Sequence, residues 1–216
     1  FPKESIKFCL AEAGITIKDV QYVSFYEKPY LKFDRLIKTY LMNAPRGMKS
    51  FITAMPLWIQ EKLWIGREIR DKLGFKGKMF YPEHHQSHAA SAFYPSPFQN
   101  AAILTMDGVG EWATSSYGIG NANKLDIKNT IRFPHSLGLL YSAFTYYTGF
   151  TVNSGEYKLM GLAPYGNPNS PQTKEFKEKT LKELVDVRDD GSILLNMKYF
   201  DYATGLKMTN NAKWTT

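Results

Sequence analysis

The sequence of 216 residues contains a single cysteine, no internal repeat and no low-complexity linker. One cysteine cannot form an internal disulfide, which favours a reducing compartment, and we expect a cytoplasmic location. Cys9 falls in an amphipathic pattern and is expected to be a buried apolar residue. No apolar run is long enough to cross a bilayer, and no signal peptide is visible. The sequence therefore predicts neither a disulfide-stabilised secreted domain nor a membrane protein.

The chain also lacks any block of charge of one sign. The formal net charge is +7, from 27 Lys and Arg against 20 Asp and Glu, but many lysines alternate with acids, as in residues 173–183. Such alternation is typical of a solvated helix face. We therefore expect small anionic ligands, such as phosphorylated metabolites, rather than nucleic acid.

What the sequence does contain is the hydrophobic periodicity of an α/β protein with a sizeable core. Apolar spacing predicts helices over residues 3–13, 30–43, 48–73, 86–96, 137–150 and 171–185. Strand patterns cover residues 19–27, 78–83, 101–107, 114–120, 124–133 and 192–200, with a turn at 121–123. The helix at 48–73 is expected to pack in the core, with a lid as the alternative. Residues 151–170, rich in glycine and proline, are predicted as a loop.

Three of the four histidines lie within five positions, at His84, His85 and His88. In a helix, His84 and His88 lie one turn apart on one face, which is the spacing that two imidazoles need to share a metal ion, although such a pair is often only structural. Asp107, at the end of a predicted strand, is a natural third ligand. His85 and His88 are also helix neighbours, so that pairing stays open. We prefer His84 as the ligand and His85 as a group beside it.

Two imidazoles and one carboxylate suit a divalent metal such as Fe(II), Zn or Mn. Directly after the carboxylate comes a glycine turn of Gly108, Val109 and Gly110. Glycines let a backbone approach an anion closely, and free amides in such a turn are predicted to hold phosphate oxygens. An Asp-Gly pair is also ordinary hairpin chemistry, and the following segment looks like a returning strand.

A second glycine-rich segment groups Gly155, Glu156 and Lys158. An isolated lysine in such a loop is usually solvent-exposed. Surrounded by glycines, Lys158 is instead able to neutralise a phosphate as a point charge. The sequence therefore offers two segments for an anionic ligand, one on each side of a predicted apolar helix.

Several blocks of this chain resemble one known family. HHQSHAASAF, DGVGEWAT, GEYKLMGLAPYG and VSFYEKPYLKFDRL are similar to signature blocks of the O-carbamoyltransferases related to nodulation and antibiotic-tailoring enzymes, in the same order and with similar spacing. The resemblance implies an N-terminal Kae1-like domain of the actin-like, sugar-kinase and Hsp70 ATPase superfamily, which is α/β and ribonuclease H-like with a mixed sheet and flanking helices. It further implies a C-terminal YrdC-like domain of the same chain.

The resemblance also implies a reaction. In this family, carbamoyl phosphate and ATP yield a carbamoyl-adenylate, and the carbamoyl group then passes to a hydroxyl of a small-molecule acceptor. The family's metal ligands match His84, His88 and Asp107, and the nucleotide or carbamoyl phosphate is expected at the two glycine-rich segments. A general base for the acceptor hydroxyl is a hypothesis only, for which His85 and Glu111 are the candidates.

Residues 1–216 correspond to part of the Kae1-like domain in this comparison. The opening strand pair, a further metal-binding aspartate and the YrdC-like domain are expected outside it, so this piece alone is expected to be inactive. The alternative is a Kae1-like protein that binds metal and nucleotide without carbamoyl transfer.

Overall fold

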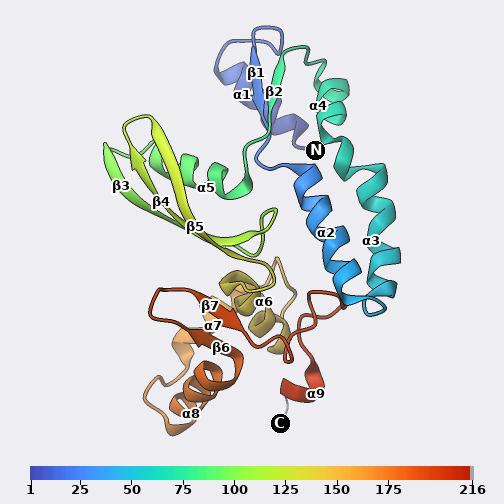
Figure 1. Cartoon of the computed structure of the whole chain (residues 1–216). Helices are drawn as coiled ribbons and strands as arrows, with labels where there is room; N and C mark the ends of the chain where they lie inside the picture. The colour runs from blue at the N-terminus through green and yellow to red at the C-terminus, as the bar shows by residue number, and fades with distance from the viewer. Residues whose placement is uncertain (215–216) are drawn as a thin grey trace.

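The computed structural model describes residues 1–214 and confirms an α/β fold. In chain order the elements are α1 (Lys3–Glu12), β1 (Tyr22–Ser24), α2 (Pro29–Asn43), α3 (Met48–Gln60), the 3₁₀ turn η1 (Lys62–Trp64), α4 (Ile65–Leu73), β2 (Lys78–Phe80), α5 (His84–Phe93), β3 (Asn100–Met106), β4 (Ala113–Asn121), β5 (Lys124–Arg132), α6 (Leu137–Tyr147), α7 (Glu156–Leu162), η2 (Ala163–Tyr165), α8 (Pro171–Lys179), the π-helical turn η3 (Thr180–Leu184), β6 (Val185–Val187), β7 (Ile193–Leu195) and α9 (Asn211–Trp214). Figure 1 shows their arrangement.

Parallel and antiparallel strand pairs are both present. Strands β1 and β2 pair in parallel, with Tyr22 opposite Lys78. Strands β3, β4 and β5 form an antiparallel meander, and the predicted turn between β4 and β5 is confirmed. Strands β6 and β7 form a separate antiparallel pair. Figure 1 shows the meander at the left, the parallel pair at the top and the β6–β7 pair below.

Helix α5 packs against the meander through small and aromatic residues. Ala89 and Phe93 of α5 are buried against Ile103 of β3. The run of alanines and serines after His88 lets the helix approach the sheet closely, as its sequence predicts. This packing fixes the helix that carries the histidine cluster against β3, the strand that Asp107 directly follows.

A second core cluster anchors the C-terminal part. Ala143 of α6 is buried with Val185, Ile193, Leu195 and Phe200, which come from β6, β7 and the segment that follows. The β6–β7 pair therefore covers one side of α6. Since α6 begins beside the end of β3, this cluster also supports the region around Asp107.

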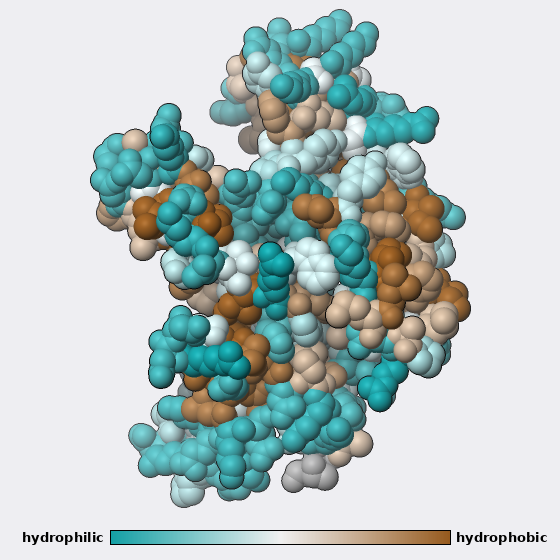
Figure 2. Space-filling view, viewed as in Figure 1, coloured by the Kyte–Doolittle hydropathy of each residue, from teal (hydrophilic) through white to brown (hydrophobic). Residues whose placement is uncertain are grey.

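The predicted helix over residues 48–73 is broken into α3, η1 and α4. The indole Nε1 of Trp64 donates to the carbonyl of Ile59 at 2.7 Å and takes an acceptor that a continuous helix would use. The core-packing prediction is wrong for most of α3, because Ile52, Leu57 and Ile59 are exposed. Met55 of the same helix, by contrast, is buried. Figure 2 shows apolar surface along this helical arm, at the right of the view.

Other sequence predictions differ in detail from the structure. The predicted loop over 151–170 contains helix α7 and the turn η2, and the strand predicted over 192–200 is ordered as a strand only in β7. Cys9 is exposed rather than buried, because α1 packs so loosely that none of its residues is buried. Within the described residues no helix is both long and apolar enough to cross a bilayer.

Candidate metal centre

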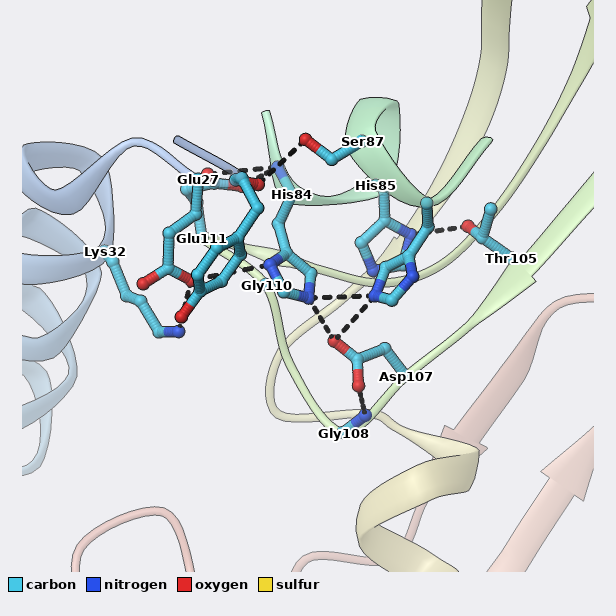
Figure 3. A network of polar contacts seen from close by, with 12 residues as sticks. Glu27, Lys32, His84, His85, Ser87, Thr105, Asp107, Gly108, Gly110 and Glu111 are labelled. Carbon is cyan, nitrogen blue, oxygen red and sulfur yellow. Dashed lines mark hydrogen bonds and ion pairs between the residues drawn. The ribbon is translucent and has the colours of Figure 1, made fainter. Parts of the chain in front are cut away.

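The three predicted metal ligands meet between α5 and the end of β3. Nε2 of His84 lies 2.8 Å from Oδ2 of Asp107 and 3.0 Å from Nε2 of His88. Nε2 of His88 lies 3.8 Å from the same carboxylate oxygen. His84 opens the helix, His88 follows one turn later, and Asp107 comes directly after β3. Figure 3 shows Asp107 pointing up at the imidazole of His84.

This triangle has the size that a divalent ion requires. With metal–ligand bonds of about 2.1 Å, donor atoms stand about 3.0 Å apart in an octahedron and about 3.4 Å apart in a tetrahedron. The separations of 2.8, 3.0 and 3.8 Å bracket that range. The side chain of His88 is 49% exposed, against 14% for His84, so the site opens on the His88 side. The residues present therefore fit a divalent metal with positions left for a ligand.

The start of α5 is fixed by two glutamates. Glu83 is the N-cap and forms a reciprocal capping box with Gln86. The carboxylate of Glu111 accepts the backbone N–H of His84 at 3.0 and 3.1 Å, and the N–H of Lys28 at 2.8 Å. Glu111 is buried and lies at the N-termini of both α2 and α5, where a negative charge is stabilised. Its oxygens therefore hold the backbone at the predicted metal ligand His84.

Glu27 lies on the other side of the His84 ring. Its Oε2 is 3.4 Å from Nδ1 of His84 and 2.6 Å from Nζ of Lys32. Asp107, and then Glu27, raise the pKa of His84 to about 9. His84 in turn lowers the pKa of Asp107 to about 2, helped by the N–H of Gly108 at 2.7 Å. Without metal, His84 and Asp107 therefore form a charged pair at neutral pH.

His85 turns away from the ligand triangle into the protein. Its Nδ1 lies 2.7 Å from Oγ1 of Thr105 and 3.2 Å from Oγ of Ser116, and these two hydroxyls are 2.6 Å apart. The side chain is buried, and burial lowers its pKa, so the ring is neutral. The alternative pairing of His85 with His88 is not formed. His85 instead ties α5 to the meander, and its buried Nε2 has no hydrogen-bond partner in the described chain.

The glycine turn after Asp107 is engaged by the protein itself. The N–H of Gly108 donates to the Asp107 side chain, and the N–H of Gly110 donates to the carbonyl of Ala113 at 2.9 Å. A Cβ on Gly110 would lie 2.9 Å from the Cβ of His84, so the glycine permits this close approach. The guanidinium of buried Arg35 donates to the carbonyl of Gly110 at 3.2 Å. Two of the three amides predicted to bind an anion are thus already used.

The second predicted segment lies at the start of α7 and contacts α6. Oε1 of Glu156 accepts the hydroxyl of Ser142 at 2.8 Å and the N–H of Asn153 at 3.0 Å, while the N–H of Gly155 lies 3.3 Å from Oε2. Lys158 is exposed, with Nζ 6.0 Å from the ring centre of Tyr157. Glu156 therefore holds the α6–α7 connection, and only Lys158 faces solvent as a free charge.

Sequence reasoning missed the residues that surround the ligands. These are Glu27, Lys32, Arg35, Thr105 and Ser116. One signal was present for Glu27, because it ends a β-branched and aromatic run in the way that Asp107 does. The contacts of the others depend on which elements pack together, which residue types alone do not reveal.

Comparison with known proteins places these features in a family. A family model described as "Carbamoyltransferase N-terminus" matches residues 1–214. An uncharacterized protein of Synechocystis sp., sll1178, is 56% identical over 97% of this chain, which covers 34% of that protein. The nodulation protein NolNO of Sinorhizobium fredii is 34% identical over 86% of this chain and 26% of its own length. The uncharacterized protein MJ1058 of Methanocaldococcus jannaschii is 36% identical over 65% of this chain and 26% of its own length. This chain thus spans between a quarter and about a third of these relatives.

Proposed function

Because the chain belongs to the carbamoyltransferase N-terminus family, we propose that it forms the metal-binding part of an enzyme that transfers a carbamoyl group to a hydroxyl of a small molecule. The observation that carries this proposal is the convergence of His84, His88 and Asp107 on one point. The mixed α/β fold agrees with the actin-like, ribonuclease H-like type that the sequence predicts. A cytoplasmic location stays a prediction.

The proposed donor system is carbamoyl phosphate with ATP. Water converts carbamoyl phosphate to carbamate and phosphate, carbamate and ATP give a carbamoyl-adenylate and pyrophosphate, and transfer of the carbamoyl group to the acceptor hydroxyl releases AMP. A divalent ion such as Fe(II), Zn or Mn, held by His84, His88 and Asp107, would supply a Lewis acid that polarises or orients a carbamoyl or phosphoryl oxygen. The side chains that hold it would come from a preformed triangle, which lowers the cost of organising the site. The exposed side of His88 leaves room for the substrate oxygen.

The protein groups around the triangle have separate proposed tasks. Glu111 binds two backbone amides, so we assign it the positioning of α5 rather than proton transfer. His85 is neutral, buried and bonded to two hydroxyls, so it orients the helix on the sheet. The acceptor's general base is then sought elsewhere, since a base must reach the proton that it removes.

Fewer groups are available to bind an anion than the sequence suggests. Of the glycine turn, Val109 contributes an amide that no described acceptor uses, whereas the amides of Gly108 and Gly110 would have to exchange partners. Lys158 of α7, whose side chain is exposed, is the proposed point charge for a phosphate. Gly155 and Glu156 shape the segment that presents Lys158.

Activity, substrates and partners are proposed for the whole protein, of which residues 1–216 form part of the Kae1-like domain. A YrdC-like domain of the same chain is the proposed partner, and residues 1–216 alone are not expected to turn over carbamoyl phosphate. The second candidate is a relative that binds metal and nucleotide without carbamoyl transfer. Both share the metal centre, so an assay of carbamoyl-phosphate-dependent pyrophosphate release from ATP by the full-length protein separates them.

The first test is metal stoichiometry in the full-length protein. We expect one divalent ion per chain in the wild type and its loss in His84→Ala and His88→Ala. His135→Gln is the matched control, because this fourth histidine binds the amide of Leu195 away from the triangle. Unchanged metal content in His84→Ala and His88→Ala would defeat the metal assignment. Metal without pyrophosphate release would favour the second candidate.

A further inference from the structure

The imidazole of His84 has two ring nitrogens in different surroundings. Its Nε2 faces Asp107 and His88. Its Nδ1 points the opposite way, is buried, and has no hydrogen-bond partner among residues 1–214. The carboxylate in contact with it is that of Glu27, with Oε2 at 3.4 Å, just beyond a good hydrogen bond. Figure 3 shows Glu27 on the far side of the ring from Asp107.

In the metal-free charged pair both ring nitrogens of His84 carry a proton, and metal binding at Nε2 displaces only one of them. A neutral imidazole carries one proton, so coordination through Nε2 leaves that proton on Nδ1. A buried N–H without an acceptor is costly, and metal-bound histidines therefore usually donate the other N–H to a carboxylate or carbonyl. His84 thus requires an acceptor on its buried side, at the place where Glu27 lies.

Glu27 is well placed and well held for this task. It is 8% exposed, and Lys32 in the first turn of α2 binds its Oε2 at 2.6 Å. Two residues before it, the N–H of Phe25 donates to the carbonyl of Phe80 at 2.9 Å. The carbonyl of Tyr26 accepts the hydroxyl of Ser87 at 2.9 Å, which ties the segment to α5 itself.

The other nearby glutamates face different groups. Glu111 uses its carboxylate oxygens on backbone amides, and Glu83 lies 3.2 Å from Nζ of Lys28. We propose that Glu27 is a positioning residue whose carboxylate accepts a hydrogen bond from the Nδ1–H of His84 in the metal-bound protein, which completes a chain of contacts from Lys32 through Glu27 and His84 to the ion. This inference rests on the metal centre in the proposed function.

The test measures metal affinity rather than activity. Full-length wild type, Glu27→Gln and Glu27→Ala are titrated with Zn(II) against a competing chelator, and with Co(II) by its visible absorption. We expect Glu27→Ala to bind about ten- to a hundredfold more weakly, and Glu27→Gln to lose less because its amide oxygen still accepts. Glu61→Gln is the matched control, because Glu61 and Glu27 both line one cavity of about 240 Å³. We expect this variant to bind the metal with wild-type affinity.

A second measurement separates positioning from general stability. In Zn(II)-loaded wild type, ¹⁵N NMR of the His84 imidazole is expected to show a strongly hydrogen-bonded Nδ1–H, which Glu27→Ala removes while the signals of His88 stay unchanged. If Glu27→Ala does not fold, an exposed, freely exchanging Nδ1–H in the wild type still overturns the proposal. Wild-type affinity in Glu27→Gln and Glu27→Ala also overturns it while the metal centre stands. Absence of metal in the wild type defeats the metal centre itself.

Discussion

The region around α5 and the region around α7 both carry predicted site residues, but they are held in different ways. Helix α5 buries His85, Ala89 and Phe93 against the meander, and its first residue is bonded from several sides. Helix α7 buries none of its residues and depends on the carboxylate of Glu156. The difference teaches that one block with candidate site residues is packed into the core, whereas the other is a surface segment.

The largest expected effect compares two aromatic residues. Phe93→Ala removes a buried ring from the α5–meander core and is expected to lower the free energy of unfolding by about 3–5 kcal/mol. Tyr165→Ala, just after α7, removes a side chain that is 88% exposed and should change it by less than about 0.5 kcal/mol. Urea denaturation of both variants measures the contrast. Similar losses in the two would mean that the α7 region is as well packed as α5.

A smaller effect compares two glycines. A Cβ on Gly138 would lie 2.5 Å from the carbonyl oxygen of Asp107 and 2.7 Å from the nitrogen of Gly108, which are backbone atoms that cannot swing away. Gly138→Ala is therefore expected to cost about 1–3 kcal/mol and to weaken metal binding by displacing Asp107.

Gly161 of α7 is the matched control, because a Cβ there meets nothing within 4 Å. Gly161→Ala is expected to be neutral or to stabilise the protein by up to about 1 kcal/mol, since alanine favours a helix. Denaturation and metal titration of both variants measure the comparison. Full metal affinity in Gly138→Ala would show that the turn tolerates displacement.

The smallest expected effect is the pH dependence of the metal-free α5 region. The pKa of His84 is raised from 6.5 to about 9, so its stabilisation is complete below 6.5 and is lost as the pH rises to about 9. The pKa of Asp107 is lowered from 3.8 to about 2, so its stabilisation is lost as the pH falls through that interval. The difference in Tm between wild type and Asp107→Asn, measured with a chelator present, should be largest between about pH 4 and 6.5. A constant difference from pH 5 to 10 would refute the charged pair.

Local pattern was enough to predict two parts of the central geometry, while the packing of α5 on β3 that joins them is a tertiary contact. The spacing of His84 and His88 fixes them on one helix face once α5 forms, and Asp107 follows the last residue of β3. The meander was also predictable, because β-branched runs and the turn at 121–123 are short-range signals. These features depend on neighbours close in sequence.

What could not be predicted depends on contacts between distant segments. Glu27 reaches His84 only because β1 pairs with β2, whose residues lie 56 positions later in the sequence than their partners in β1. A single side chain can also interrupt a helix that the apolar periodicity predicts. The indole N–H of Trp64 donates to the carbonyl of Ile59, beside the end of α3. The exposure of Cys9 and of the α3 apolar face follows from which elements pack, which amphipathicity alone does not specify.

The bridging carboxylate of Glu111 has a mechanical consequence. It accepts hydrogen bonds from a backbone N–H at the N-terminus of each of two helices, that of Lys28 directly before α2 and that of His84 at the start of α5. A tilt of the helical arm formed by α2, α3 and α4 would therefore either lengthen these hydrogen bonds or displace the backbone of His84. Glu111 thus couples the position of the helical arm to the position of His84, a proposed metal ligand.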